Sequence, residues 1–164
     1  MENCQWQFDS PQESNPAGYR TPIGYTEDMK VHAFRLKPDT DLKESIEEFV
    51  NRTAIRAGFI VTRVGGLKQA TVRMAGALPD SQDIRTFTGD FEIVSLVGTV
   101  STNGCHLHMS FSDKDGIVRG GHLKEGTIID PTAEIIIGEA ETITFSRELD
   151  KTTGFKELVV NPSK

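Results

Sequence analysis

The chain has 164 residues, of which 37% are hydrophobic and 26% are charged, and its formal net charge is −6. This length and composition suit one soluble globular domain that is large enough to bury a core. The acidic balance disfavours unaided binding to nucleic-acid phosphates, which depends on clustered Lys and Arg side chains.

Membrane insertion and disulfide bonding are also disfavoured. No apolar run reaches the roughly 18 residues that a membrane span needs, and the segment 1–28 lacks the apolar core of a signal peptide. The two cysteines, Cys4 and Cys105, form no C-x-x-C pair and no disulfide framework. We therefore predict an intracellular, cytoplasmic protein without a membrane partner, although a nuclear location fits these features as well.

The segment 1–28 is rich in Pro, Gly, Ser and Asn, which is typical of a flexible or loosely docked arm. Its aromatic residues are candidates to anchor it on the folded part: Trp6, Phe8, Tyr19 and Tyr25. We predict two parts, an arm over 1–28 and a folded domain over 29–164.

The folded part begins with one strand and one helix. Met29–Leu36 is typical of a strand, and Asp41, three residues before Glu44, predicts a helix start. A helix over about 41–57 would end at Gly58 as its C-terminal cap. Its apolar stripe consists of Leu42, Ile46, Phe49, Val50 and Thr53. The opposite face, which we expect to be solvated, carries Lys43, Glu44, Glu47 and Glu48.

Strand patterns dominate the rest of the chain. Outside a hairpin described next, the predicted strands are Phe59–Val64, Leu67–Ala75, Phe91–Ser101, Thr132–Ile137, Ile143–Leu149 and Leu158–Val160. Ala77–Thr88 is predicted as a polar loop, and Thr153-Gly154 as a turn. The fold class is therefore α+β, a mostly antiparallel sheet with one main helix on a face.

Three of the four histidines lie within the stretch Gly104–Leu123. His106 and His108 are two residues apart, so on a strand their side chains share a face. We expect a three-residue loop, Lys114–Gly116, formed by a type I turn and a left-handed glycine. In that register His108 faces His122, and all three imidazoles share one face.

A two-residue Asp-Gly turn is the competing possibility, and it would place His122 out of phase with the other two histidines. A bulge at Gly120-Gly121 would then correct the slip. Neither this glycine pair nor Gly65-Gly66 has a phosphate-loop fingerprint, so we predict turns or bulges at both.

Three imidazoles at one place predict a metal site made by His106, His108 and His122. Three neutral nitrogens leave the fourth tetrahedral position to water or substrate. Zn²⁺ suits imidazole ligands, and Fe, Ni and Cu suit them too. The alternative is that the histidines are held by ordinary hydrogen bonds. Several carboxylates are candidates for acid or base chemistry, without a signal that selects one: Glu92, Asp113, Glu125 and Glu134.

The remaining polar candidates have simpler interpretations. Alternation turns Cys105 away from His106, as a small buried residue, and His32 is predicted to be structural. Arg35 and Arg147 could form a cleft for an anionic small molecule, or could be paired with carboxylates in the sheet or between subunits. Glu92, Glu134 and Glu148 are the carboxylates considered in both cases, as members of the cleft and as partners in the pairs.

Several motifs together resemble the plants and prokaryotes conserved (PPC) domain: R-L-K-P followed by D-L, F-E-I-V-S-L-V-G-T-V, H-L-H-M-S-F-S-D-K-D-G-I-V-R-G-G-H-L, and T-A-E with F-S-R-E-L-D. The resemblance covers about Lys30–Val160. It implies a compact α+β fold that forms a homotrimer. In plants the domain follows AT-hook motifs, which contact the DNA minor groove, and prokaryotic members are labelled DNA-binding by that association.

The chain lacks the Arg-Gly-Arg core of an AT-hook, because 1–28 holds a single basic residue, Arg20. It keeps the three hairpin histidines, as many prokaryotic members do. We predict a PPC homotrimer with a three-histidine metal site that binds a small molecule or runs a metal-dependent reaction. The alternatives are a DNA- or chromatin-associated assembly module acting through protein partners, without direct nucleic-acid contact, and a purely structural oligomer.

Overall fold

The computed structural model describes residues 29–163, so the predictions for the arm 1–28 lie outside the described residues. Its elements, in chain order, are β1 (Met29–Leu36), α1 (Leu42–Thr53), β2 (Gly58–Arg73), β3 (Ile84–Ser101), β4 (Gly104–Ser112), β5 (Val118–Leu123), β6 (Ile128–Ala140), β7 (Ile143–Leu149) and β8 (Lys156–Pro162).

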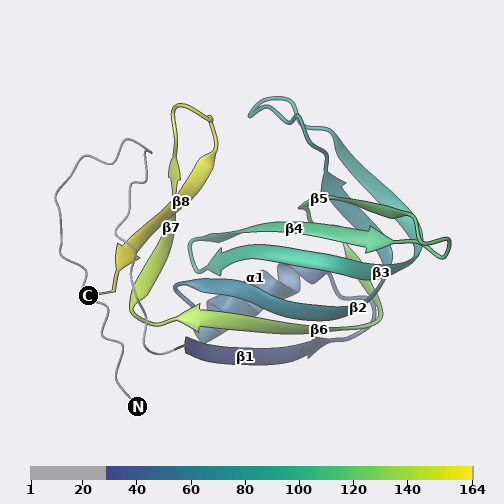
Figure 1. Cartoon of the computed structure of the whole chain (residues 1–164), viewed down its shortest axis with the longest axis horizontal. Helices are drawn as coiled ribbons and strands as arrows, with labels where there is room; N and C mark the ends of the chain where they lie inside the picture. Colours follow the sequence, from purple (N-terminus) through teal and green to yellow (C-terminus); the bar gives the residue numbers. More distant parts are fainter. Residues whose placement is uncertain (1–28, 164) are drawn as a thin grey trace, which may run out of the picture.

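The main sheet has six antiparallel strands in the order β1-β6-β2-β3-β4-β5 (Figure 1). Its last strand also pairs with β2, through Val72 opposite Leu123 and Arg73 opposite His122. This extra pairing closes β2, β3, β4 and β5 into a ring. Strands β7 and β8 form a separate two-stranded sheet. The α+β class, mostly antiparallel with one helix in the described residues, is confirmed.

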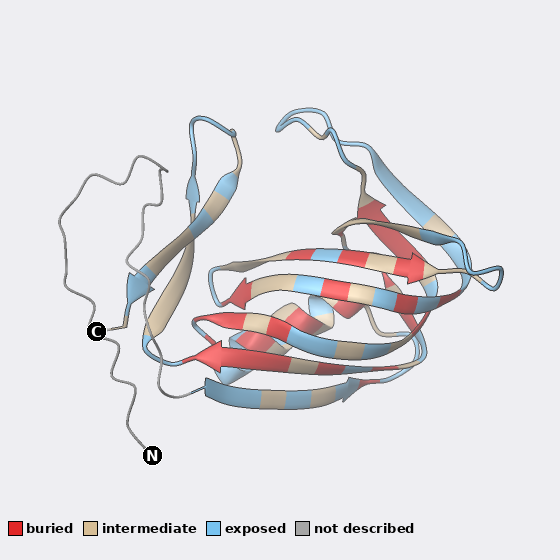
Figure 2. Cartoon of the chain, in the orientation of Figure 1, coloured by how far each residue is buried: buried red, intermediate tan, exposed pale blue. Residues whose placement is uncertain are grey.

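The core lies between α1 and the main sheet, and Figure 2 shows its buried positions on α1 and along the strands of the main sheet. Leu42 and Ile46 on the helix and Ile135 on β6 are fully buried. Burying one such side chain contributes about 1.5–3 kcal/mol. The β7–β8 hairpin, by contrast, contains only half-buried and exposed residues.

The helix starts as predicted but ends earlier. The Asp41 side chain accepts a hydrogen bond from the Glu44 backbone N–H at 3.0 Å, which confirms the cap. At the other end Ala54 takes the left-handed conformation, with φ 55°, and its N–H bonds the Val50 and Asn51 carbonyls. The chain turns there because Ile55 is fully buried in the core.

Gly58 is therefore not the helix cap. It lies at the start of β2, where a Cβ would come within 2.7 Å of Val100 Cγ2. A glycine is needed at this position because the backbone passes close to its neighbours.

Strands β2, β3, β6 and β8 are all longer than predicted, and the first two change how the loops beside them are interpreted. β2 continues through Gly65-Gly66, where its pairing with β6 shifts register, so the predicted bulge is confirmed there. β3 begins at Ile84, so Ile84–Thr88 is strand and not the predicted loop. Polar side chains do not prevent this, since the backbone from Ile84 to Thr88 pairs with β2 from Arg73 to Gln69.

No helix within residues 29–163 has the length and apolar content that crossing a bilayer requires. The cytoplasmic location stays a prediction.

Candidate metal centre

The β4–β5 hairpin has the predicted three-residue loop. Asp113 faces Ile117 through the bond from the Asp113 N–H to the Ile117 carbonyl at 3.1 Å, and Gly116 is left-handed with φ 77°. The Asp113 carboxylate accepts the N–H groups of Asp115 and Ile117 at 3.0 and 2.9 Å, which stabilises this turn. His108 consequently lies opposite His122, and the predicted register is confirmed.

The prediction of a turn or bulge at Gly120-Gly121 is wrong, because β4 and β5 pair there without a register shift. Both glycines permit close strand approach. A Cβ on Gly120 would lie 2.4 Å from the Met109 carbonyl oxygen, and one on Gly121 would lie 2.4 Å from that of Arg73. β5 is thus pressed between β4 and the end of β2, and this position brings His122 to the other histidines.

The three imidazoles lie close together on β4 and β5, beside the end of β2. Their ring centroids lie 4.9–5.3 Å apart, and one nitrogen of each lies within 4.8 Å of the others. The Nε2 atoms of His106 and His108 are 3.1 Å apart. His106 and His122 are half-buried, while His108 is exposed. This is the donor set that a divalent metal uses, although metal binding at these residues stays a prediction.

The environment keeps two of the rings neutral. Burial, together with nearby Arg73 and the other two histidines, lowers the pKa of His122 to about 4. Burial also lowers the pKa of His106, with Arg147 as the next cause. A neutral imidazole offers the free electron pair that a metal needs. Among the described residues, moreover, nothing hydrogen-bonds the buried His122 Nδ1, which is costly unless a ligand satisfies it.

A cavity of about 470 Å³ opens beside the imidazoles. Its lining comes from five strands, from α1 and from the loops beside them. The lining residues are Glu47, Arg73, Asn103, Gly104, Cys105, His106, His108, His122, Arg147, Phe155, Lys156 and Glu157. The β7–β8 hairpin supplies Arg147 and forms one wall with Phe155, Lys156 and Glu157. The sequence offered Arg147 as a candidate, but no signal pointed to Phe155, Lys156 or Glu157, since the place of the hairpin depends on a contact between two separate sheets.

The carboxylates at this cavity are not the predicted ones. Asp113 pairs with Arg119 at 2.8 Å, and that hydrogen bond lowers its pKa. Glu125 pairs with Lys43 at 2.7 Å. Glu92 and Glu134 are exposed and lie outside the cavity lining. Glu47 and Glu157 line it instead.

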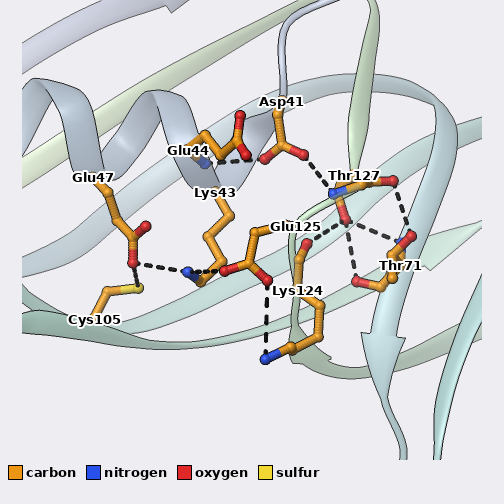
Figure 3. Close-up of polar contacts among 10 residues, drawn as sticks. Asp41, Lys43, Glu44, Glu47, Thr71, Cys105, Lys124, Glu125 and Thr127 are labelled. Atoms are coloured by element: carbon orange, nitrogen blue, oxygen red, sulfur yellow. Dashed lines mark hydrogen bonds and ion pairs between the residues drawn. The ribbon is translucent and has the colours of Figure 1, made fainter.

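Glu47 lies in a polar network, not on the solvated helix face that was predicted (Figure 3). Its Oε1 accepts hydrogen bonds from Lys43 Nζ at 2.8 Å and from Cys105 Sγ at 3.0 Å. Burial and the Glu47 carboxylate raise the pKa of Cys105 to about 12, so the thiol stays protonated. Burial lowers the pKa of Lys43, but the hydrogen bonds to Glu125 and Glu47 outweigh this and raise it. Cys105 is half-buried and touches the cavity, so its prediction as a small buried residue holds only in part.

Arg147 is held against the main sheet. Its backbone N–H binds Asn103 Oδ1 at 2.9 Å, and its Nη2 donates to Thr99 Oγ1 at 2.5 Å. Arg35 is exposed on β1 and does not line the cavity to which Arg147 belongs, so the predicted Arg35–Arg147 cleft does not form. His32 lies apart from the other histidines, with Nε2 2.9 Å from Glu139 Oε2, which fits its predicted structural role.

Comparison with known proteins identifies the fold family. The sequence profile of the Plants and Prokaryotes Conserved (PCC) domain matches residues 23–141. Two curated bifunctional GlmU proteins from Synechococcus strains are 37% identical over 145 residues and 36% identical over 152 residues. These alignments cover 88% and 93% of the chain, which spans only 22% of the length of each relative.

Solved structures agree with this match. A hypothetical protein from Salmonella enterica is 32% identical with a TM-score of 0.80, over 86% of this chain and 99% of that one. A metal-containing protein from Archaeoglobus fulgidus is 26% identical with a TM-score of 0.73, over 85% and 99%. A plant- and prokaryote-conserved protein from Pyrococcus horikoshii is 26% identical with a TM-score of 0.67, over 82% and 97%. The motifs, the fold and these relatives agree that the chain belongs to the Plants and Prokaryotes Conserved domain family.

Proposed function

We propose that the protein is a homotrimeric metal-binding PPC domain whose centre is formed by His106, His108 and His122 and which takes a small molecule in the adjoining cavity. Zinc is the proposed metal, because imidazole suits it, and Fe, Ni and Cu are the alternatives. The observation that carries the proposal is the cluster of three imidazoles, in which one nitrogen of each ring lies within 4.8 Å of the others. His122 also has a buried Nδ1 without a hydrogen-bond partner among the described residues.

The residues present fit such a metal. Two of the three rings are kept neutral by their surroundings, as metal ligation requires. Three protein ligands and an adjoining cavity are typical of sites that keep a position open for water or substrate. When bound, the metal would supply a Lewis acid there. The structural relative from Archaeoglobus fulgidus is itself described as metal-containing, and it is 26% identical to this chain.

Homotrimer formation is supported by the outer surface of the sheet as well as by the family resemblance. Val61 and Val64 on β2 are 51% and 59% exposed, and Val94 and Val97 on β3 are 47% and 55% exposed. Exposed apolar side chains on neighbouring strands are typical of a surface that a partner covers. Light scattering should give about three times the chain mass of 18.1 kDa, and a clean monomer would contradict the assembly.

Metal analysis tests the centre directly. We expect untagged wild-type protein to carry close to one divalent metal per chain, and the His106→Ala/His108→Ala double variant to carry almost none. His32→Ala is the matched control, since this histidine lies outside the cluster and should leave the metal content unchanged. If wild type and the double variant hold equally little metal after incubation with Zn²⁺, the proposed centre is wrong.

A further inference from the structure

The cationic side chains of the histidine cavity differ from its carboxylates in how they are paired. Glu47 accepts hydrogen bonds from Lys43 and Cys105, and Glu157 accepts one from Thr153 Oγ1 at 2.9 Å. Both carboxylates therefore already have donors inside the protein.

Within residues 29–163, by contrast, no carboxylate lies in salt-bridge range of the cationic residues of the cavity, Arg73, Arg147 and Lys156. Arg147 uses one of its five N–H donors, on the neutral Thr99 hydroxyl. The Arg73 guanidinium lies 5.4 Å from the centroid of the Phe155 ring. Partly buried cations are normally paired with an anion, because leaving water without one is costly.

The Arg147 guanidinium is also held in place, and the sheet fixes the backbone position of Arg73. The backbone of Arg147 is bonded to Asn103, and its side chain to Thr99 on β3. Arg73 is at the end of β2, directly opposite His122 in the register. A guanidinium that is fixed before binding loses little side-chain entropy, and its planar fork matches a carboxylate or a phosphate.

We infer that the small molecule taken by the cavity is an anion, whose carboxylate or phosphate group binds Arg147 and Arg73 beside the histidine centre. The inference rests on the proposed metal-binding function and assigns its ligand class. A bound divalent metal adds positive charge to the same cavity, which favours an anion further.

The β7–β8 hairpin is central to this recognition, since it provides both Arg147 and the Phe155 ring against which Arg73 lies. It forms its own small sheet, which stands apart from the main sheet in Figure 1. The family profile ends at residue 141, before this hairpin begins. Arg147 and Phe155 thus lie outside the part of the chain that the profile matches, whereas Arg73 lies within it.

Calorimetric titration of Zn²⁺-loaded full-length protein tests the inference, with metal content measured on every sample. Inorganic phosphate and succinate are the probes for the two anion classes, and succinamide is the neutral counterpart of succinate. We expect at least one anion to bind, succinamide not to bind, and Arg147→Gln to weaken anion binding about tenfold or more, since a charged hydrogen bond is lost. Arg73→Gln should weaken it as well, with the metal content of both variants unchanged.

Arg35→Gln is the matched control, because it removes the same charge from an exposed arginine on β1. Its anion affinity should stay within about twofold of wild type, since exposed charges act weakly through solvent. Arg147→Lys, which keeps the charge and loses the fork, serves as a second variant if Arg147→Gln does not fold.

The outcomes are distinguishable. Binding of phosphate alone or succinate alone supports the inference and names the anion class. Metal-loaded wild type that binds neither probe at millimolar concentration overturns it and leaves the metal centre standing. Equal weakening in Arg35→Gln and Arg147→Gln also overturns it, as a general charge effect. If the wild type takes up no metal, the proposed metal centre is wrong, and this inference fails with it.

Discussion

The sheet under α1 and the cavity at the β4–β5 hairpin share strands but differ in how their polar groups are satisfied. In the first region the fully buried Thr127 hydroxyl lies within hydrogen-bond distance of the carbonyls of Thr71 and Lys124 (Figure 3), while among the described residues Arg63 Nε on β2 is buried without a partner. In the second, within residues 29–163, His122 Nδ1 has no hydrogen-bond partner, and no carboxylate lies in salt-bridge range of Arg73 or Arg147. The first arrangement stabilises the fold, while the second leaves binding capacity for a ligand.

The largest expected effect comes from the core. Ile135→Ala empties a fully buried position on β6, and the free energy of unfolding should fall by about 2–5 kcal/mol. Urea unfolding followed by circular dichroism measures this. The metal content of the folded protein should be unchanged, because Ile135 lies outside the cavity lining. Loss of metal from folded Ile135→Ala protein would show that the two regions are not separate.

His122→Ala should change stability only through the loss of bound metal, whereas Ile135→Ala changes it through the core. Metal at about 100 times its dissociation constant stabilises the wild type by about 2.7 kcal/mol, and a chelator removes this. We therefore expect EDTA to lower the melting temperature of the wild type and to leave that of His122→Ala unchanged. An equal response of both proteins would contradict the role of His122 as a ligand.

Gly121→Ala tests the link between the two regions. The new Cβ would be 2.4 Å from the Arg73 carbonyl oxygen, so β5 has to move away from β2. We expect a loss of about 1–3 kcal/mol in stability, together with weaker metal binding, because His122 is the next residue. Unfolding and metal titration of the same preparations measure both. Normal metal affinity in a destabilised Gly121→Ala variant would show that the close β2–β5 approach does not position His122.

The last effect concerns pH. The pKa of His122 is about 4 in the folded metal-free protein and lies near its ordinary value, 6.5, in the unfolded chain. The unfolded state therefore binds more protons between these values, so the stability of the metal-free protein should fall as pH decreases from about 6.5 towards 4. Unfolding in EDTA across this window should show a shallower fall for His122→Asn. An identical pH dependence in both proteins would exclude this titration as the cause.

Local patterns account for what was predicted correctly. The cap of Asp41 on Glu44 depends on residues three apart, and the pairing of His108 with His122 depends on the short loop after Asp113. The end of α1 was missed because it depends on Ile55 entering a core made by distant strands. The start of β3 was missed because pairing with β2, and not side-chain polarity, makes Ile84–Thr88 a strand.

The same distinction applies to the candidate site. The sequence by itself determined the fold class, the family and the histidine hairpin, because strand alternation and turn geometry operate within a few residues. Only the tertiary structure decided that Arg73, Arg147 and Glu47 join the histidines around one cavity. These residues come from β2, β7 and α1, and they meet through the closure of β2 on β5 and the placement of the β7–β8 hairpin. Contacts between elements so far apart in the chain leave no periodic signal in the sequence, since they depend on how the whole core packs.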